Sequence, residues 1–89
     1  MVRFSRLHPD SRGSLEAWYQ EVKSAIWTSS ADIKSHYPSA SIINNSRVVI
    51  NICGNKYRLV VQVNYPAGIV YVRFIGTHKE YDRIDVESV

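Results

Sequence analysis

Four short apolar runs, separated by turn residues, fill the second half of this 89-residue chain and restrict the folds open to it. Apolar and polar residues alternate within the runs, with the period of two that marks a strand with one buried face. Clusters of Asn, Gly and Pro separate the runs, and Asn45 and Asn55 fall in two of these turns. The pattern predicts an antiparallel meander with strands at 40–43, 47–52, 56–65 and 69–76.

Two helices are predicted before the strands. Behind Ser14, a suitable N-cap, apolar residues recur at helical spacing, namely Leu15, Trp18, Tyr19, Val22 and Ile26. This stripe predicts an amphipathic helix over 14–27, and a second helix is predicted over 30–37, ended by Pro38. The chain is long enough for one core, so we expect a single α+β domain over 1–89: two N-terminal helices packed on a curled antiparallel sheet of three to four strands.

Composition and charge exclude several classes of function for this chain. The net charge is only +3, but Arg47 to Phe74 contains four cations and no carboxylate, so the sheet is locally cationic. His and Cys residues lack ligand spacing, which predicts no metal site and no cofactor, and the single Cys53 predicts no internal disulfide. No apolar run approaches the roughly 20 residues of a membrane span, and no signal peptide is recognisable, so we expect a cytoplasmic protein without membrane contact.

Arg58 and Arg73 lie inside strand-like runs, where a guanidinium must stay hydrated, pair with an anion or face a ligand. Alternation places Arg58 and Gln62 on one face, opposite to the residues that would face the helices, namely Tyr57, Leu59, Val61 and Val63. In the last run it groups Val70, Val72 and Phe74 on the helix face and Tyr71, Arg73 and Ile75 on the other. If Asn64 pairs with Ile69, Val60 lies opposite Arg73 and Arg58 opposite Ile75, which predicts diagonal arginines in a cationic cleft.

Several segments together resemble the HigB family of toxins from toxin–antitoxin systems. They are Trp18-Tyr19, Trp27, Ala31-Asp32-Ile33-Lys34, the stretch GNKYRLV from Gly54 to Val60, and Val72 to Asp82 with its THKEYD segment. The resemblance extends over nearly the whole chain from His8 onward. It implies a RelE-like fold and an mRNA interferase that acts on messages in the ribosome and is neutralised by a HigA-type helix-turn-helix antitoxin. Operator DNA would be contacted only through that antitoxin.

RNA scission without a metal needs a base for the 2'-hydroxyl, cations for the phosphorane and an acid for the leaving oxygen. We expect Arg58 and Arg73 to clamp the scissile phosphate, with Lys56 and Lys79 adding positive field. His78 is the favoured proton carrier, and Tyr81 either carries a proton or stacks on a base; which group is base and which is acid stays open. Lys34 is a candidate RNA contact, although an exposed helix lysine needs no such role. The alternative is a non-catalytic module that binds RNA or a protein through the same face.

The N-terminus departs from the family pattern. Members of the family open with a further strand before the region that matches Val2 to His8. Either the true start lies upstream or the sheet is short. We therefore expect an exposed sheet edge and a partner that covers it.

Overall fold

A computed structural model describes residues 2–44, 46–54 and 56–89, so the predicted turn residues Asn45 and Asn55 lie outside the described residues. The helices are α1 (Val2–Leu7), the short 3-10 helix η1 (Pro9–Ser11), α2 (Arg12–Ser24), α3 (Ser30–His36) and α4 (His78–Tyr81). The strands are β1 (Ser41–Ile42), β2 (Arg47–Ile52), β3 (Tyr57–Asn64) and β4 (Ile69–Thr77). They form one antiparallel sheet in the order β1-β2-β3-β4, which confirms the predicted meander and the α+β class.

The helices differ in part from the prediction. Among the described residues α1, η1 and α2 precede α3, and only α2 is longer than two turns, so two N-terminal helices were too few. The first predicted helix begins earlier, because Ser11 rather than Ser14 precedes its first turn, and it ends before Ala25, whose backbone is extended. Ile26 lies beyond that end and is 89% exposed, so its predicted place on the buried stripe was wrong.

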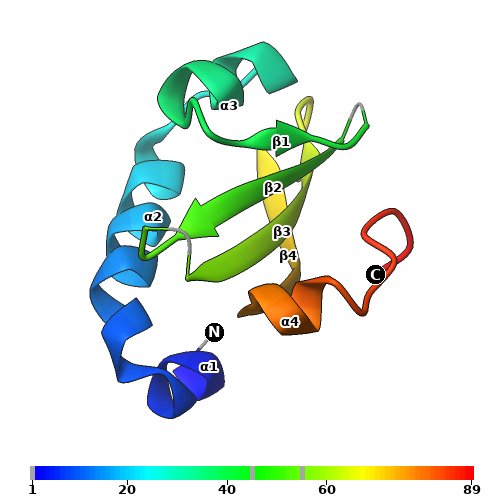
Figure 1. Cartoon of the computed structure of the whole chain (residues 1–89). Helices are drawn as coiled ribbons and strands as arrows, with labels where there is room; N and C mark the ends of the chain where they lie inside the picture. The colour runs from blue at the N-terminus through cyan, green and yellow to red at the C-terminus, as the bar shows by residue number, and fades with distance from the viewer. Residues whose placement is uncertain (1, 45, 55) are drawn as a thin grey trace.

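One hydrophobic core joins the helices to a single face of the sheet. Leu15 and Trp18 from α2 and Ile33 from α3 are buried there. Alternate residues of the two central strands meet them, as the period of two predicts: Val48, Ile50, Ile52, Tyr57, Leu59, Val61 and Val63. Figure 1 shows α2 on this side of the sheet and α4 with the C-terminal loop on the other. The helices of the core do not cover that second side, and the candidate site lies there.

A β-bulge at Arg73 changes the predicted register. Asn64 pairs with Ile69 as expected, but Val61 pairs with Val72 and Val60 with Phe74, which leaves Arg73 as the extra residue of β4. Beyond the bulge every side chain changes face. Ile75 therefore packs against the helix-side core and Phe74 faces the other way, the reverse of the predicted assignment.

The N-terminal segment is tied to the start of β3 by Asp10. Its carboxylate accepts hydrogen bonds from the Tyr57 hydroxyl at 2.6 Å and from the Lys56 ammonium at 2.9 Å. The Tyr57 bond, with the Lys56 bond second, lowers the pKa of Asp10 below its usual value. Phe4 and His8 pack on the Tyr57 ring, with centroids 5.2 and 5.1 Å away. This cluster holds α1 and η1 against the end of the sheet.

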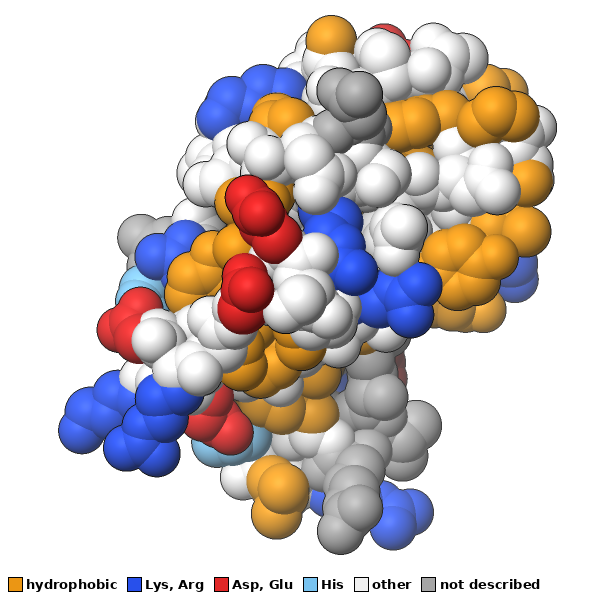
Figure 2. Space-filling view, turned by 90° about the vertical axis from the view of Figure 1, so that its right-hand side faces the viewer, with side chains coloured by type: hydrophobic (Ala, Val, Ile, Leu, Met, Phe, Trp, Pro, Cys, Tyr) orange, Lys and Arg blue, Asp and Glu red, His pale blue; other side chains and the backbone are white. Residues whose placement is uncertain are grey.

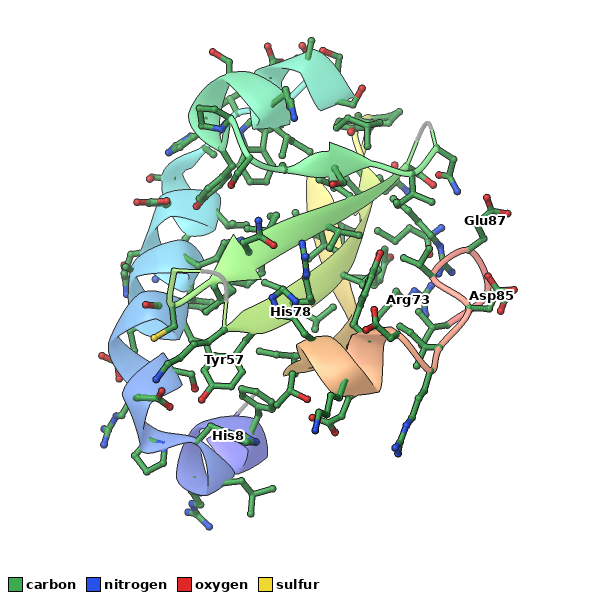
Figure 3. All side chains as sticks on the ribbon, in the orientation of Figure 1. His8, Tyr57, Arg73, His78, Asp85 and Glu87 are labelled. Atoms are coloured by element: carbon green, nitrogen blue, oxygen red, sulfur yellow. The ribbon has the colours of Figure 1, made fainter. Side chains whose placement is uncertain are left out.

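The C-terminal residues fold back along the far face of the sheet. The guanidinium of Arg47, through Nη1, donates to the main-chain oxygens of Val86 at 3.0 Å and Val89 at 2.6 Å. Figure 3 shows Asp85 and Glu87 on this loop, on the side of the sheet where Arg73 also lies. The tail is therefore held by its backbone at the start of β2.

Gly76 is required where β4 leads into α4. A Cβ atom there would lie 2.6 Å from Phe74 Cζ and 3.2 Å from Glu80 Cβ, so the phenyl ring would have to move. We expect Gly76→Ala to lower the free energy of unfolding by about 1–3 kcal/mol, as overpacking does. Chemical denaturation measures it. Gly13→Ala is the matched control, because nothing lies within 4 Å of its added methyl group, and it should leave stability unchanged or higher. Equal effects of both variants would contradict the packing argument.

Stability should fall in acid through Asp10. Because the pKa of Asp10 is lower in the folded state, the ionised carboxylate stabilises the fold above the unfolded pKa, and this contribution is lost as the pH falls through the folded pKa. We expect Asp10→Asn to lose less stability than the unmodified chain between about pH 5 and about pH 2. Denaturation at a series of pH values tests this. Tyr57→Phe removes the largest cause of the shift and should also flatten the profile. Parallel profiles for all three proteins would refute it.

Candidate active site

The face of the sheet turned away from α2 carries the predicted site. Arg47 pairs with Gln62 and Arg58 with Asn51, which places these four side chains there. Arg73, the bulge residue, joins them through its hydrogen bond to Gln62. Figure 2 looks onto this side of the molecule and shows Lys and Arg side chains next to acidic ones, with hydrophobic side chains between and around them. Val49 and Val60 are buried between the polar positions, so the strands beneath them are rigidly packed.

Arg58 is half-buried and lies at the end of this face that is next to α4. Its Nη1 donates to Asn51 Oδ1 on the neighbouring strand, and its guanidinium carbon lies 5.5 Å from the centroid of the Tyr81 ring. Its Nε is buried and has no hydrogen-bond partner among the described residues. Buried donors are normally satisfied, so this one is available to an incoming acceptor.

α4 carries three of the predicted site residues, His78, Lys79 and Tyr81, and Tyr81 lies beside Arg58. A capping box starts the helix: the Thr77 hydroxyl accepts from the Glu80 backbone N–H at 3.3 Å, and the Glu80 carboxylate accepts from the Thr77 N–H at 3.0 Å. These bonds hold the pKa of Glu80 below its usual value. The helix is only four residues long, so its caps and the contact between Phe74 and Tyr81, with centroids 6.5 Å apart, fix its position.

His78 is the first residue of α4, two positions after Gly76, which pairs with Arg58. Its Nε2 is buried and lacks a hydrogen-bond partner within the described part of the chain. Figure 3 shows His78 where α4 meets the sheet. The structure thus brings Arg58, His78 and Tyr81 to one end of the face, and two of the three have a buried nitrogen that finds no partner among residues 2–44, 46–54 and 56–89. The neighbouring Lys79 is exposed.

Arg73 lies elsewhere on the face. Its Nε donates to Gln62 Oε1 at 2.9 Å, and its guanidinium carbon lies 5.6 Å from the centroid of the Tyr71 ring. Gln62 is four residues from Arg58 along β3, a separation of about 13 Å. The predicted diagonal pair, with Val60 opposite Arg73 and Arg58 opposite Ile75, was therefore wrong: the bulge gives each guanidinium its own partners.

Two of the predicted RNA-binding lysines already contact other parts of the chain. Lys56 pairs with Asp10 at the end of the sheet where the N-terminal segment packs. Lys34, on α3, donates to the main-chain oxygen of Ala40 and so closes the connection from α3 to β1. Their contacts with RNA stay predictions.

The sequence reasoning missed three polar partners on this face: Asn51, Gln62 and Tyr71. Alternation had placed Gln62 beside Arg58 and Tyr71 beside Arg73, so the signal for their position was present. Which of them contacts a guanidinium depends on the register across strands, which the bulge changes.

Two other features bear on the class of site. No group of three or more His, Cys, Asp or Glu side chains among residues 2–44, 46–54 and 56–89 is arranged to hold a metal ion. Of the helices in the described part, none has the length and hydrophobicity to cross a membrane.

Comparison with known proteins agrees with the geometry. Residues 11–84 match the model of the HigB toxin family, described as the RelE-like toxic component of a toxin–antitoxin system. The chain is also similar to the mRNA interferase HigB of Escherichia coli O6:H1, with 22% identity over 82 residues that make up 90% of this chain and 80% of that protein. The matched range includes α2, α3, the whole sheet and α4. This chain therefore belongs to the HigB family of RelE-like toxins.

Proposed function

We propose that this protein is a metal-independent mRNA endoribonuclease that cleaves messages in the ribosome and is held inactive by a HigA-type antitoxin. The family model and the name of the Escherichia coli relative support the toxin class and the mRNA substrate. One observation carries the catalytic assignment: Arg58 Nε and His78 Nε2 are both buried, and neither has a partner among the described residues. Two polar nitrogens left unsatisfied at one end of a cationic face suit a substrate that supplies the missing acceptors.

The chemistry follows from the substrate's own 2'-hydroxyl. Attack of its oxygen on the adjacent phosphorus forms a new P–O bond, and the bond to the 5'-oxygen breaks, leaving a cyclic phosphate and a 5'-hydroxyl. Arg58 donates hydrogen bonds to the phosphorane oxygens as their negative charge grows. His78 and Tyr81 transfer the protons, one removing the 2'-hydroxyl proton and the other supplying one to the leaving oxygen. No step requires a metal ion.

Arg73 takes a different role from the predicted clamp. Because it lies by Gln62 and Tyr71 rather than beside Arg58, it contacts a flanking phosphate or nucleotide instead of the scissile group. Lys79, exposed on α4, adds positive field near Arg58. The RNA would then run along β3 and β4, from the β3–β4 turn toward α4.

Cleavage of a defined mRNA with and without ribosomes is the decisive experiment. Fragments that appear only when the message is being translated would support ribosome-dependent cleavage, and fragments from free mRNA would show that the ribosome is dispensable. If RNA binds but stays intact under both conditions, the non-catalytic alternative replaces the proposal.

Arg58→Ala should lower the single-turnover cleavage rate about 10²–10³-fold, since it removes a donor that stabilises transition-state charge. His78→Gln should lower the same rate while leaving RNA affinity unchanged, because proton transfer belongs to the transition state. Arg12→Ala is the matched control. Arg12 pairs with Glu16 on the exposed surface of α2, so the Arg12→Ala protein should cleave RNA at the unmodified rate. Wild-type rates in folded Arg58→Ala and His78→Gln proteins would reject the site.

The antitoxin should cover the outer edge of β4. Within the described residues β4 pairs on one side only, and Ile69, Tyr71 and Val72 are exposed along it. An unpaired edge of this kind accepts a strand or an adjacent helix from a partner. Such binding would mask the face that carries Arg73.

We expect coexpression with the antitoxin to raise the melting temperature, because a ligand at a hundredfold excess over Kd adds about 2.7 kcal/mol of stability. Val72→Lys should weaken the complex, measured by calorimetry. Tyr19→Lys, a change at an exposed position of α2, should not weaken it. Equal affinities for the two variants would place the antitoxin elsewhere.

A further inference from the structure

The structure contains an open groove at the β3–β4 turn, away from Arg58, that the cleavage chemistry does not use. It has a volume of about 540 Å³ and is lined by side chains that include Ser46, Gln62, Asn64, Tyr65, Tyr71 and Arg73. This volume falls within the roughly 300–1,000 Å³ of small-molecule sites. The wall is firm, because the main chain of Ser46 accepts a 2.7 Å hydrogen bond from the Val63 N–H.

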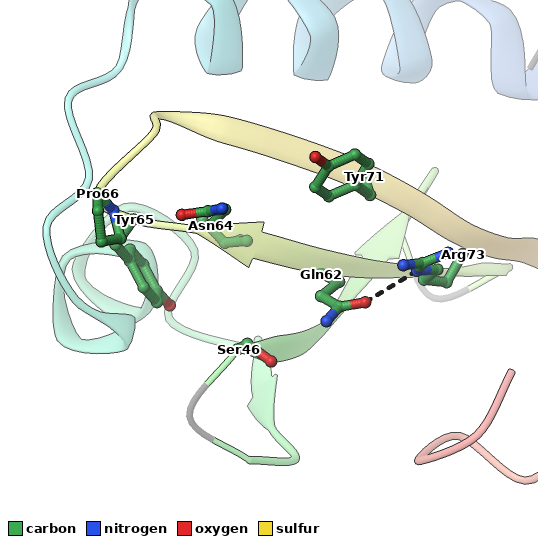
Figure 4. Close-up of a pocket in the computed structure, with 8 residues that line it drawn as sticks. Ser46, Gln62, Asn64, Tyr65, Pro66, Tyr71 and Arg73 are labelled. Carbon is green, nitrogen blue, oxygen red and sulfur yellow. Dashed lines mark hydrogen bonds between the residues drawn. The ribbon is translucent and has the colours of Figure 1, made fainter.

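The hydrogen-bond network fixes which way the Gln62 carboxamide points. Arg73 Nε can only donate, so the atom 2.9 Å from it must be the carbonyl oxygen of Gln62. The amide nitrogen of Gln62 is then left with two N–H donors, and no described residue accepts from them. Figure 4 shows the oxygen directed at Arg73 and the nitrogen directed away from it.

Asn64 is oriented by the same logic. The Ala67 backbone N–H donates to its Oδ1 at 3.2 Å, so the amide nitrogen of Asn64 is a donor, and no residue that the structure describes accepts from it. Gln62 and Asn64 are two residues apart in β3 and therefore lie on one face. The groove thus presents two neighbouring amide donors, with both acceptor oxygens already used inside the protein.

A flat aromatic platform lies next to these donors. Tyr71 pairs directly with Gln62 across the strands and is 44% exposed, and the Arg73 guanidinium lies over its ring. The Tyr65 hydroxyl, also in the lining, is buried without a partner among the described residues. An exposed ring with an adjacent guanidinium is a stacking surface for an unpaired base, and the guanidinium can also contact the phosphate.

We propose that this groove is a nucleobase subsite that selects guanine in the bound RNA, an inference that rests on the proposed function. The base stacks on Tyr71, and its N7 and O6 atoms accept hydrogen bonds from the amide groups of Gln62 and Asn64. Guanine presents these two acceptors side by side, whereas adenine replaces O6 with an N6 amino donor that would oppose a second donor. Arg73 holds Gln62 in its donor orientation and contacts the adjoining phosphate.

The test is equilibrium binding of short single-stranded RNAs that carry 2'-deoxy sugars and so cannot be cleaved. Oligonucleotides with one central guanine, adenine, inosine or 7-deazaguanine are compared on the unmodified chain. We expect guanine and inosine, which share N7 and O6, to bind about tenfold more tightly than adenine. The 7-deazaguanine probe, which lacks the N7 acceptor, should bind more weakly than guanine. Equal affinities for guanine, adenine and 7-deazaguanine would overturn the assignment.

Variants separate hydrogen bonding from stacking. Gln62→Glu and Asn64→Asp exchange the amide donors for acceptors at nearly constant shape, so each should reduce the ratio of guanine to adenine affinity. Using a ratio cancels the general repulsion of an added carboxylate, and Gln20→Glu on exposed α2 is the charge-matched control that should keep the ratio. Tyr71→Leu should weaken all four probes several-fold, while Tyr71→Phe keeps the ring and should not. Unchanged ratios in both carboxylate variants would also overturn the proposal.

Failure here and failure of the nuclease proposal give different results. Base preference without cleavage of any message would reject the endoribonuclease and keep the groove as an RNA-binding subsite. Cleavage that depends on Arg58, combined with no base preference in binding, would reject the guanine subsite alone.

Discussion

The extra residue in β4 is the constraint on which the rest of this structure depends. The apolar positions of β4 cannot all serve the helix-side core in one unbroken register. With Arg73 inserted as a bulge, Val70 and Ile75 pack toward the helices while Phe74 turns to the far side. A bulge also bends its strand and increases the local twist, which here separates the part of β4 that pairs with Gln62 from the part that leads into α4. The far face is consequently divided into two regions.

These two regions suit different tasks. Near α4, Arg58 contacts Asn51 and the Tyr81 ring, and Arg58 Nε and His78 Nε2 are buried without a hydrogen-bond partner among the described residues. Near the β3–β4 turn, amide groups and an exposed tyrosine offer polar edges and a flat surface. Arg58, Gln62 and Asn64 project from β3, most of whose residues are buried, while Tyr71 lies on β4 and Tyr81 on α4. Preorganisation of this kind is what electrostatic stabilisation of a transition state requires.

Much of the fold could be predicted from the sequence, because the signals were local. The period of two and the turn residues located β2, β3 and β4 within one residue at every end, and the helix predicted before Pro38 matches α3. The start of α2 was missed, since the Ser11 hydroxyl donates to the His8 carbonyl at 2.7 Å and the helix begins without a side-chain cap. α4 carried a readable signal, the Thr77 to Glu80 capping box, which the strand-centred interpretation passed over.

The sequence predicted which face of the sheet the candidate site residues occupy, but not which residues they contact. Alternation assigned Arg58 and Gln62 to one side of β3, and this needed no knowledge of the neighbouring strand. The partner of Arg73 depends on pairing across two strands, and a single inserted residue changes it without any distinctive composition. The position of Lys56 was decided by Asp10, which is 46 residues away in the chain, and no local pattern reports a contact over that separation.

The hydrogen bonds of Arg47 give the C-terminal tail an anchor that is indifferent to side-chain identity. Both acceptors, at Val86 and Val89, are main-chain oxygens, which every amino acid possesses. Substitutions at Glu87 can therefore alter the charge of the tail while these two bonds are kept. Asp85 differs, because its Oδ1 accepts a hydrogen bond from the Glu87 N–H at 3.1 Å and so helps to shape the loop. Replacing Arg47 at the start of β2 would remove both bonds at once and so release the tail from the sheet, whatever side chains the tail carries.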